Sequence, residues 1–177
     1  VALSEIGHLV EVPIRGTGDL HWTVKGKSPE LNLGFQMAVQ DAEFLRMQLG
    51  TVTGLVTWQD GKDRLLVQDL KANLGVMQAV ANGALDMGPG RNDINLDVRV
   101  PRGSLQDFDA LMTEYLQESV PWYPHSIIGD MNGFVKVSGQ VTPDRISVVG
   151  DMTVQNVVFG GEVFNEGSFR AGYRGGD

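Results

Sequence analysis

The residues of this chain whose types could support catalysis, metal binding or phosphate binding include its histidines and its closely spaced glycines. His8, His21 and His125 lie far apart, and none has a carboxylate or second histidine at a metal-ligand spacing. No HExxH, GxSxG or P-loop pattern occurs. Gly16-x-Gly18 resembles the start of a phosphate loop, but the alternating residues after it predict a strand, whereas a phosphate loop opens a helix. The sequence therefore predicts that the chain is not an enzyme and has no catalytic residues.

Acidic and aromatic residues offer two further kinds of site. Asp60, Asp63 and Asp93 match no EF-hand spacing, and acidic residues at turns are usually solvated, so we expect no metal site and no cofactor. Three aromatic residues could form a platform for a sugar: Trp58, Trp122 and Tyr123. The last two lie between prolines after a helical segment, where packing against the end of a sheet is the better explanation.

Composition excludes several classes of partner. The 177 residues suit a single domain, and the formal net charge of -8 argues against binding to nucleic acid or to anionic membrane surfaces. Cysteine is absent, which excludes disulfides and thiolate metal sites. No apolar run reaches the roughly 20 residues of a membrane-spanning helix. Since the chain begins at Val1 without a signal-like segment, we expect residues 1–177 to be one β-rich segment of a longer protein.

Short runs of strictly alternating apolar residues dominate the chain and predict strands with one apolar face. The clearest runs are centred on residues 31–39, 94–100 and 146–154. Gly makes up 23 residues, and pairs such as Asn82-Gly83 and Asn132-Gly133 are typical of turns between strands. We therefore expect a long antiparallel meander of some ten to twelve strands.

One segment breaks this alternation. From Ser104 the apolar residues fall at helical spacing as far as Leu116, with Ser104 placed as the N-cap and Asp107 in the first turn. Pro121 ends the pattern. The sequence predicts one short helix near residues 104–118, which would cover an open end of the sheet as a lid or plug.

Two stretches, residues 24–44 and 137–159, repeat one pattern. Both contain Val-x-Gly, then Pro followed by an acidic residue, an alternating apolar run, and Val-Gln followed by Asp or Asn before a final Phe. Val67-Gln68-Asp69 echoes the centre of the unit. Such repetition indicates an array in which one supersecondary element recurs because no single copy can bury its apolar face.

The repeat resembles the AsmA-like and TamB-like proteins of bacterial envelopes. Val137-Ser138-Gly139-Gln140-Val141, the Pro143-Asp144 turn and the alternating run to Phe159 carry the resemblance. It implies a sheet curled into a trough that is open along one side and lined with aliphatic side chains, in the manner of a folded taco. It further implies a periplasmic protein anchored in the inner membrane, which meets membranes through parts outside this segment. The resemblance also implies phospholipid transport between the inner and outer membranes, or support of outer-membrane protein assembly beside an Omp85-type barrel.

The residues themselves leave alternatives open. A closed β-sandwich with a filled core would satisfy the same alternation, and could bind a ligand. An exposed sheet edge could instead add a strand to a client protein, as an interaction module in secretion or assembly. If the sheet forms a groove that holds phospholipid acyl chains, we expect eleven residues to line it: Leu31, Leu33, Phe35, Met37, Val39, Ile94, Leu96, Val98, Val148, Met152 and Val154.

Overall fold

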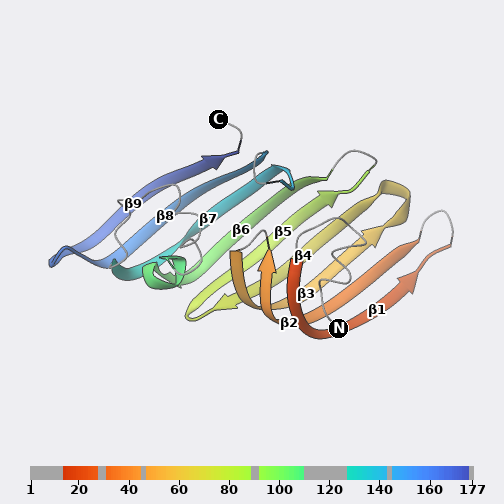
Figure 1. Cartoon of the computed structure of the whole chain (residues 1–177), viewed down its shortest axis with the longest axis horizontal. Coiled ribbons are helices and arrows are strands. Elements are labelled where there is room, and N and C mark those ends of the chain that lie inside the picture. Colours follow the sequence, from red (N-terminus) through yellow and green to blue (C-terminus); the bar gives the residue numbers. More distant parts are fainter. Residues whose placement is uncertain are drawn as a thin grey trace.

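A single antiparallel sheet makes up most of the protein. The structure, a computed structural model, describes residues 14–27, 31–44, 47–88, 92–109, 127–142 and 145–175. Each strand pairs with the next along the chain, in the order β1-β2-β3-β4-β5-β6-β7-β8-β9 (Figure 1). The strands are β1 (Ile14–Lys25), β2 (Asn32–Phe44), β3 (Met47–Gln59), β4 (Arg64–Leu74), β5 (Met77–Asp86), β6 (Asp93–Ser104), β7 (Ile128–Gln140), β8 (Ile146–Phe159) and β9 (Glu162–Arg174).

The antiparallel, curled meander expected from the alternating pattern is confirmed. The sheet does not close, because β1 and β9 each have only one neighbouring strand. The described residues form nine strands, fewer than the ten to twelve expected, because each strand runs for 10 to 14 residues. They also form one sheet and not the two layers of a sandwich.

Extra residues in the even-numbered strands help to curl this sheet. Asp41 in β2, Asp69 in β4 and Asn156 in β8 have positive φ values of 51°, 47° and 53°, and the pairing registers shift beside each of them. Each is a β-bulge, which bends a strand and increases its twist. The three bulges coincide with the repeated Val-Gln-Asp or Val-Gln-Asn of the sequence, so the repeat marks where the strands bend.

Asn82-Gly83 and Asn132-Gly133 do not form turns, and that expectation was wrong. Gly83 lies inside β5 and Gly133 inside β7, with φ values of 148° and 157°. A Cβ at Gly83 would lie 2.1 Å from the carbonyl oxygen of Asn95 on the neighbouring strand. Glycine is needed here because two strands approach each other closely within the curled sheet.

The connections between strands are short where the structure describes them. Gly160 and Gly161, both with positive φ, make the two-residue turn between β8 and β9, as a tight hairpin requires. The 3-10 turn η1 (Asp60–Lys62) joins β3 to β4. Gly75 begins the two-residue turn between β4 and β5.

The predicted helix begins where expected. Residues 105–109 are helical, and the backbone N–H of Asp107 donates to Ser104 Oγ at 3.0 Å, which confirms Ser104 as the N-cap. The Asp107 carboxylate also accepts hydrogen bonds from the backbone N–H groups of Val76 and Met77, at 2.7 and 2.9 Å. These bonds fix the helix to the β4–β5 turn. Residues 110–118 of the expected helix lie outside the described residues.

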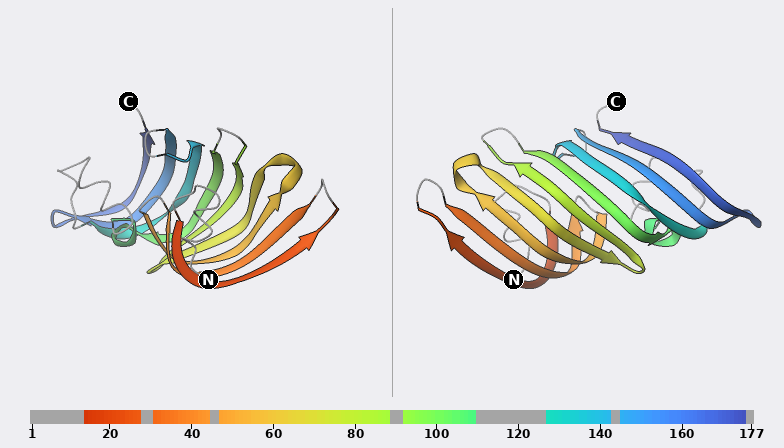
Figure 2. Two further views of the ribbon diagram at one scale, coloured as in Figure 1. Left: turned by 45° about the vertical axis from the view of Figure 1, so that its right-hand side comes forward. Right: turned by 180° about the vertical axis from the view of Figure 1, so that it is seen from behind.

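The outer ends of β1, β2 and β3 fold back over the sheet and form what we call the arm (residues 14–16, 42–44 and 47–50). The bend follows three neighbouring residues with positive φ, Gly16, Asp41 and Gly50. Figure 2 shows these red and orange strand ends turned up into the curve of the sheet. Phe44 of the arm packs against the buried cluster of Ile94, Val141 and Ile146 on the far side of that curve.

Candidate functional site: the apolar face of the sheet

One side of the sheet, the side against which the arm packs, is apolar from β1 to β9. Its central row of cross-strand neighbours passes through all nine strands with aliphatic or aromatic side chains and one glycine: Trp22, Phe35, Val56, Val67, Gly83, Leu96, Val137, Val148 and Tyr173. The adjacent row, on the other side of the sheet, includes Thr23, Thr57, Asn95, Ser138 and Arg174. The two sides, which we call the apolar face and the polar face, therefore differ sharply in their chemistry.

The apolar face lines the inside of the curl. Phe44 and Ala42 at the outer end of β2 belong to it, and Phe44 packs against the buried cluster on the same face that contains Ile94 of β6 and Ile146 of β8. Two distant parts of one face can meet only if the sheet bends towards that face. The polar face is consequently the convex one.

Ten of the eleven predicted lining residues lie in strands and on the apolar face. They come from only three strands: Leu33, Phe35, Met37 and Val39 from β2; Ile94, Leu96 and Val98 from β6; Val148, Met152 and Val154 from β8. Leu31 directly precedes β2 and is half-buried. Val39, Ile94 and Met152 are buried, whereas the other lining residues are half-buried. Strands β3 to β5 separate the β2 group from the β6 group.

The same face contains many residues that were not among the eleven predicted lining residues. Among them are Val52, Val56, Leu65, Val67, Leu85, Met77, Val100, Met131, Val135, Val137 and Phe169. Glycines hid the alternation in these strands, because Gly54, Gly83 and Gly133 occupy apolar-face positions. The sequence signal that could have revealed these residues is the alternation of apolar and polar residues on either side of each glycine.

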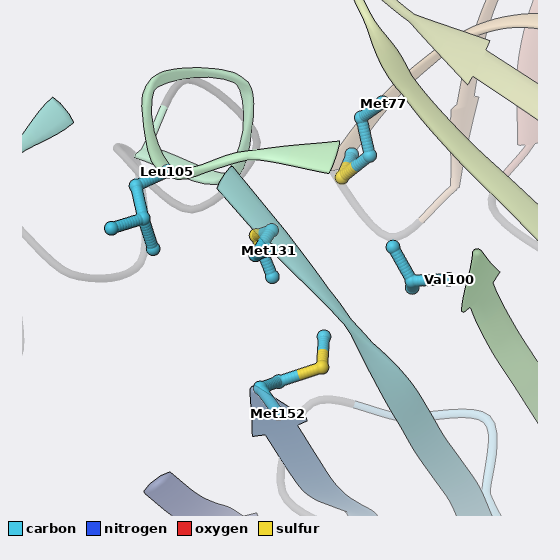
Figure 3. Packing of buried hydrophobic residues seen from close by; sticks show 5 residues of the cluster. All are labelled: Met77, Val100, Leu105, Met131 and Met152. Carbon is cyan, nitrogen blue, oxygen red and sulfur yellow. The ribbon is translucent and has the colours of Figure 1, made fainter. Parts of the chain in front are cut away.

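Three clusters of buried side chains divide the apolar face. The first surrounds Ile94, Val141 and Ile146, and the third surrounds Val39, Ala42 and Val52. The second contains five residues, drawn in Figure 3: Met77, Val100, Leu105, Met131 and Met152. Met131 is only 2% exposed, although it lies in a sheet with one described layer.

Methionine is prominent in this second cluster, which lies where the helical turn meets the sheet. The figure shows Met131 between Leu105 of the helical turn and Met152 of β8. Phe108 of the same turn packs against the cluster. Methionine is unbranched and flexible, so this end of the apolar face can adapt to fillings of different shape.

Exposure rises towards the two edges of the sheet. Trp22 on β1 is 68% exposed and Tyr173 on β9 is 46% exposed, although both belong to the central apolar row. The apolar face therefore continues to both edges without a polar border.

Ion pairs are concentrated on the polar face. Arg170 of β9 donates through Nε at 3.1 Å to both carboxylate oxygens of Asp151 on β8, and also through Nη2. This bonding, together with the attraction between the two opposite charges, lowers the pKa of Asp151 and raises the pKa of Arg170. Arg64 and Asp86 form a similar pair that raises the pKa of Arg64. Lys136 Nζ lies 3.6 Å from Asp97 Oδ1.

The candidates for chemistry do not assemble into a site in the described part of the chain. No three His, Asp or Glu side chains lie close enough to hold a metal ion, and no polar or charged residue is buried. His21 is exposed in β1 opposite Gln36, while His8, His125, Trp122 and Tyr123 lie outside the described residues. Trp58 is part of the apolar face, opposite Leu33. Within the described residues, no helix has the length and hydropathy to cross a bilayer.

Comparison with protein-family models, with curated proteins and with solved structures found no match.

Proposed function

We propose that the apolar face binds the acyl chains of phospholipids, and that the chain is a non-enzymatic segment of a lipid conduit. The observation that carries this proposal is the central row, which crosses nine strands without a charged side chain on the concave side of the sheet. Exposed apolar surface of this extent usually marks a binding site. Acyl chains suit it because the face offers aliphatic contacts and, among the described residues, no polar or charged residue is buried that would select a polar ligand.

From the resemblance to AsmA-like and TamB-like proteins, we propose that the chain acts in the bacterial envelope. On that basis the chain belongs to a periplasmic protein anchored in the inner membrane, which carries phospholipid to or from the outer membrane. The arm supports a conduit with a partly covered face, because Phe44 bridges the curve of the sheet. In the same proposal, an Omp85-type barrel is the partner in outer-membrane assembly.

Photo-crosslinking tests the proposal with matched positions. Leu96 and Asp97 are neighbours in β6 that lie on opposite faces, as Phe35 and Gln36 do in β2. A photo-reactive amino acid at Leu96 or Phe35 should capture phospholipid from vesicles, whereas one at Asp97 or Gln36 should not. Native mass spectrometry of the purified chain should also detect bound phospholipid. Equal capture from the two faces, or protein without lipid after incubation, would contradict the proposal.

A second function is favoured by the two open edges of the sheet. β1 and β9 each leave one row of backbone N–H and C=O groups without a strand partner in the described sheet. Such edges add strands from other chains, as in β-augmentation. An assembly module of this kind should bind an extended client peptide in a lipid-free preparation, and fluorescence anisotropy with labelled peptides from outer-membrane strands would measure it.

A further inference from the structure

The arm reaches the far side of the curve through one described side chain. Phe44 packs against the buried cluster of Ile94, Val141 and Ile146. Among the described residues that pack against this cluster, Phe44 is the only one that comes from β1, β2 or β3. The outer end of β2 is therefore joined to β6 and β8 across the curve of the sheet, into which Figure 2 shows the arm turned.

The cluster on which Phe44 packs is also part of the proposed lipid site. Leu96 and Val137 of the central apolar row pack against the same cluster. These two residues are neighbours across β6 and β7, and both are only half-buried. An acyl chain lying along the central row would need the apolar surface that Phe44 occupies. The phenyl group and the acyl chain are therefore competitors for one patch of the face.

The base of the arm is held more firmly than its tip. At the base, Val39 and Ala42 are buried in one cluster, and a Cβ at Gly50 would lie 2.2 Å from the carbonyl oxygen of Asn73. At the tip, Phe44 is half-buried. Since stabilisation by apolar contact grows with the area buried, one half-buried side chain gives way before a buried cluster does. The tip is thus the part of the arm that opens most readily.

We propose that the arm is a latch on the lipid site, which Phe44 holds closed, and that an acyl chain enters the central row only when Phe44 leaves the cluster. This inference rests on the proposed function and adds its regulation. The apparent affinity for lipid is then the affinity of the open form multiplied by the fraction of molecules that are open. With about 10% of molecules open, loss of the latch should raise the affinity for lipid about ten-fold.

Removal of the phenyl group tests the latch directly. Wild-type protein and Phe44→Ala are titrated with phosphatidylcholine vesicles, and native mass spectrometry measures the bound phospholipid. Phe44→Ala should reach half-saturation at about ten-fold lower lipid concentration. Leu49→Ala is the matched control, because Leu49 lies in the arm but packs against the cluster of Val39 and Val52. It should bind lipid as the wild type does.

A reducible crosslink gives a second test, which decides the matter if Phe44→Ala is poorly folded. The natural chain contains no cysteine, so Phe44→Cys combined with Val141→Cys provides two thiols that a short bis-methanethiosulfonate reagent can join. The locked arm should bind lipid about ten-fold more weakly than the same protein after reduction. The control pair is Glu43→Cys with Gln48→Cys, which are opposed within the arm itself. Crosslinking there does not tether the arm to the cluster, so reduction should not change lipid binding.

The outcomes separate the latch from the proposed function. Equal affinity in wild type and Phe44→Ala, weaker affinity in Phe44→Ala, or a locked arm that binds as well as the reduced one would each overturn the latch. In all of these the protein still binds lipid, so the proposed function would stand. If no form bound lipid, including the reduced double variant, the proposed function would fail and the latch with it.

Discussion

At the scale of single residues, position on the apolar face determines whether a side chain supports stability or is available to a ligand. Ile94 is 3% exposed at the centre of a cluster, while Leu96, two residues along the same strand and face, is half-buried. Both are aliphatic and both were predicted to line the groove. Only their burial separates a core role from a binding role.

We expect Ile94→Asp to unfold the domain and Leu96→Asp to leave it folded but unable to bind lipid. A buried charge without a partner costs several kcal/mol, which approaches the whole stability of many domains. At Leu96 the carboxylate can turn towards solvent, so the loss should fall mainly on lipid binding. Circular dichroism with thermal melting, and lipid capture in native mass spectrometry, measure the two effects. Aggregation and loss of structure in Leu96→Asp would assign that position to a filled core.

The Asp151–Arg170 pair gives the polar face a defined response to acid. Because bonding to Arg170 lowers the folded-state pKa of Asp151, the pair stabilises the fold above the unfolded-state pKa of about 3.9. That stability is lost as the pH falls through the lower folded-state pKa.

Asp151→Asn should therefore be less stable than wild type at pH 7, and the difference should shrink in strong acid. Urea midpoints at neutral pH and in a series of acidic buffers would measure this. Asp97→Asn is the control, because it removes a carboxylate from the same face. The cation beside Asp97 is Lys136, whose Nζ lies 3.6 Å from Asp97 Oδ1. A difference that stays constant down to the lowest pH would contradict the assignment.

At the scale of the elements, bulges and strand glycines determine the curvature. Asp69 has φ 47°, its backbone N–H donates to Asn82 Oδ1 at 2.9 Å, and its carboxylate accepts from Asn82 Nδ2 at 3.3 Å. Asp and Asn tolerate this conformation better than other residues with side chains. We expect Asp69→Ala to lower the free energy of unfolding by about 1–2 kcal/mol, and Asp69→Asn to change it little. Urea unfolding measures both, and equal losses in the two variants would argue against a conformational cause.

Gly83→Ala should be more damaging, because the new Cβ would meet the Asn95 carbonyl oxygen at 2.1 Å. We expect a loss of about 2–3 kcal/mol from the forced shift of two strands. Gly88→Ala is the matched control, since a Cβ there would have no neighbour within 4 Å. If the two substitutions had the same effect on the urea midpoint, close strand approach would not explain the glycine in β5.

At the scale of the whole molecule, the arm links parts of the sheet that are otherwise distant. Extensive contacts join only consecutive strands, so the strands resemble a linear array. Phe44 adds a link from β2 to the cluster on β6 and β8. This link stabilises the curl through a contact that consecutive hairpins alone do not supply.

We expect Phe44→Ala to reduce hydrogen-exchange protection around Ile94 and Ile146, with a loss of about 1–3 kcal/mol for a partly buried aromatic side chain. Leu49→Ala is the control, because Leu49 lies in the arm but packs against the cluster of Val39 and Val52. Its effect should stay within β2 to β4. Unchanged protection in β6 and β8 of Phe44→Ala would show that the arm does not hold the curl.

The sequence by itself determined the class of fold. Alternation along residues 31–39 and 94–100 gave strands with one apolar face, since side chains of a strand point to opposite sides in turn. The helical spacing after Ser104 and its N-cap were also readable, because a helix start depends on local hydrogen bonds. The repeated Val-Gln-Asp and Val-Gln-Asn were visible as a pattern, although their role as bulges was not.

Only the tertiary structure decided how these strands meet. Asn-Gly reads as a turn in isolation, and Gly83 is instead a strand residue because Asn95 on another strand leaves no room for a Cβ. The sequence gives no sign that Phe44 reaches the cluster around Ile94, fifty residues away, because that packing depends on bends in three paired strands at once. Register and curvature arise from interactions between strands, so the burial that separates Ile94 from Leu96 could not be predicted from either residue's neighbours in the chain.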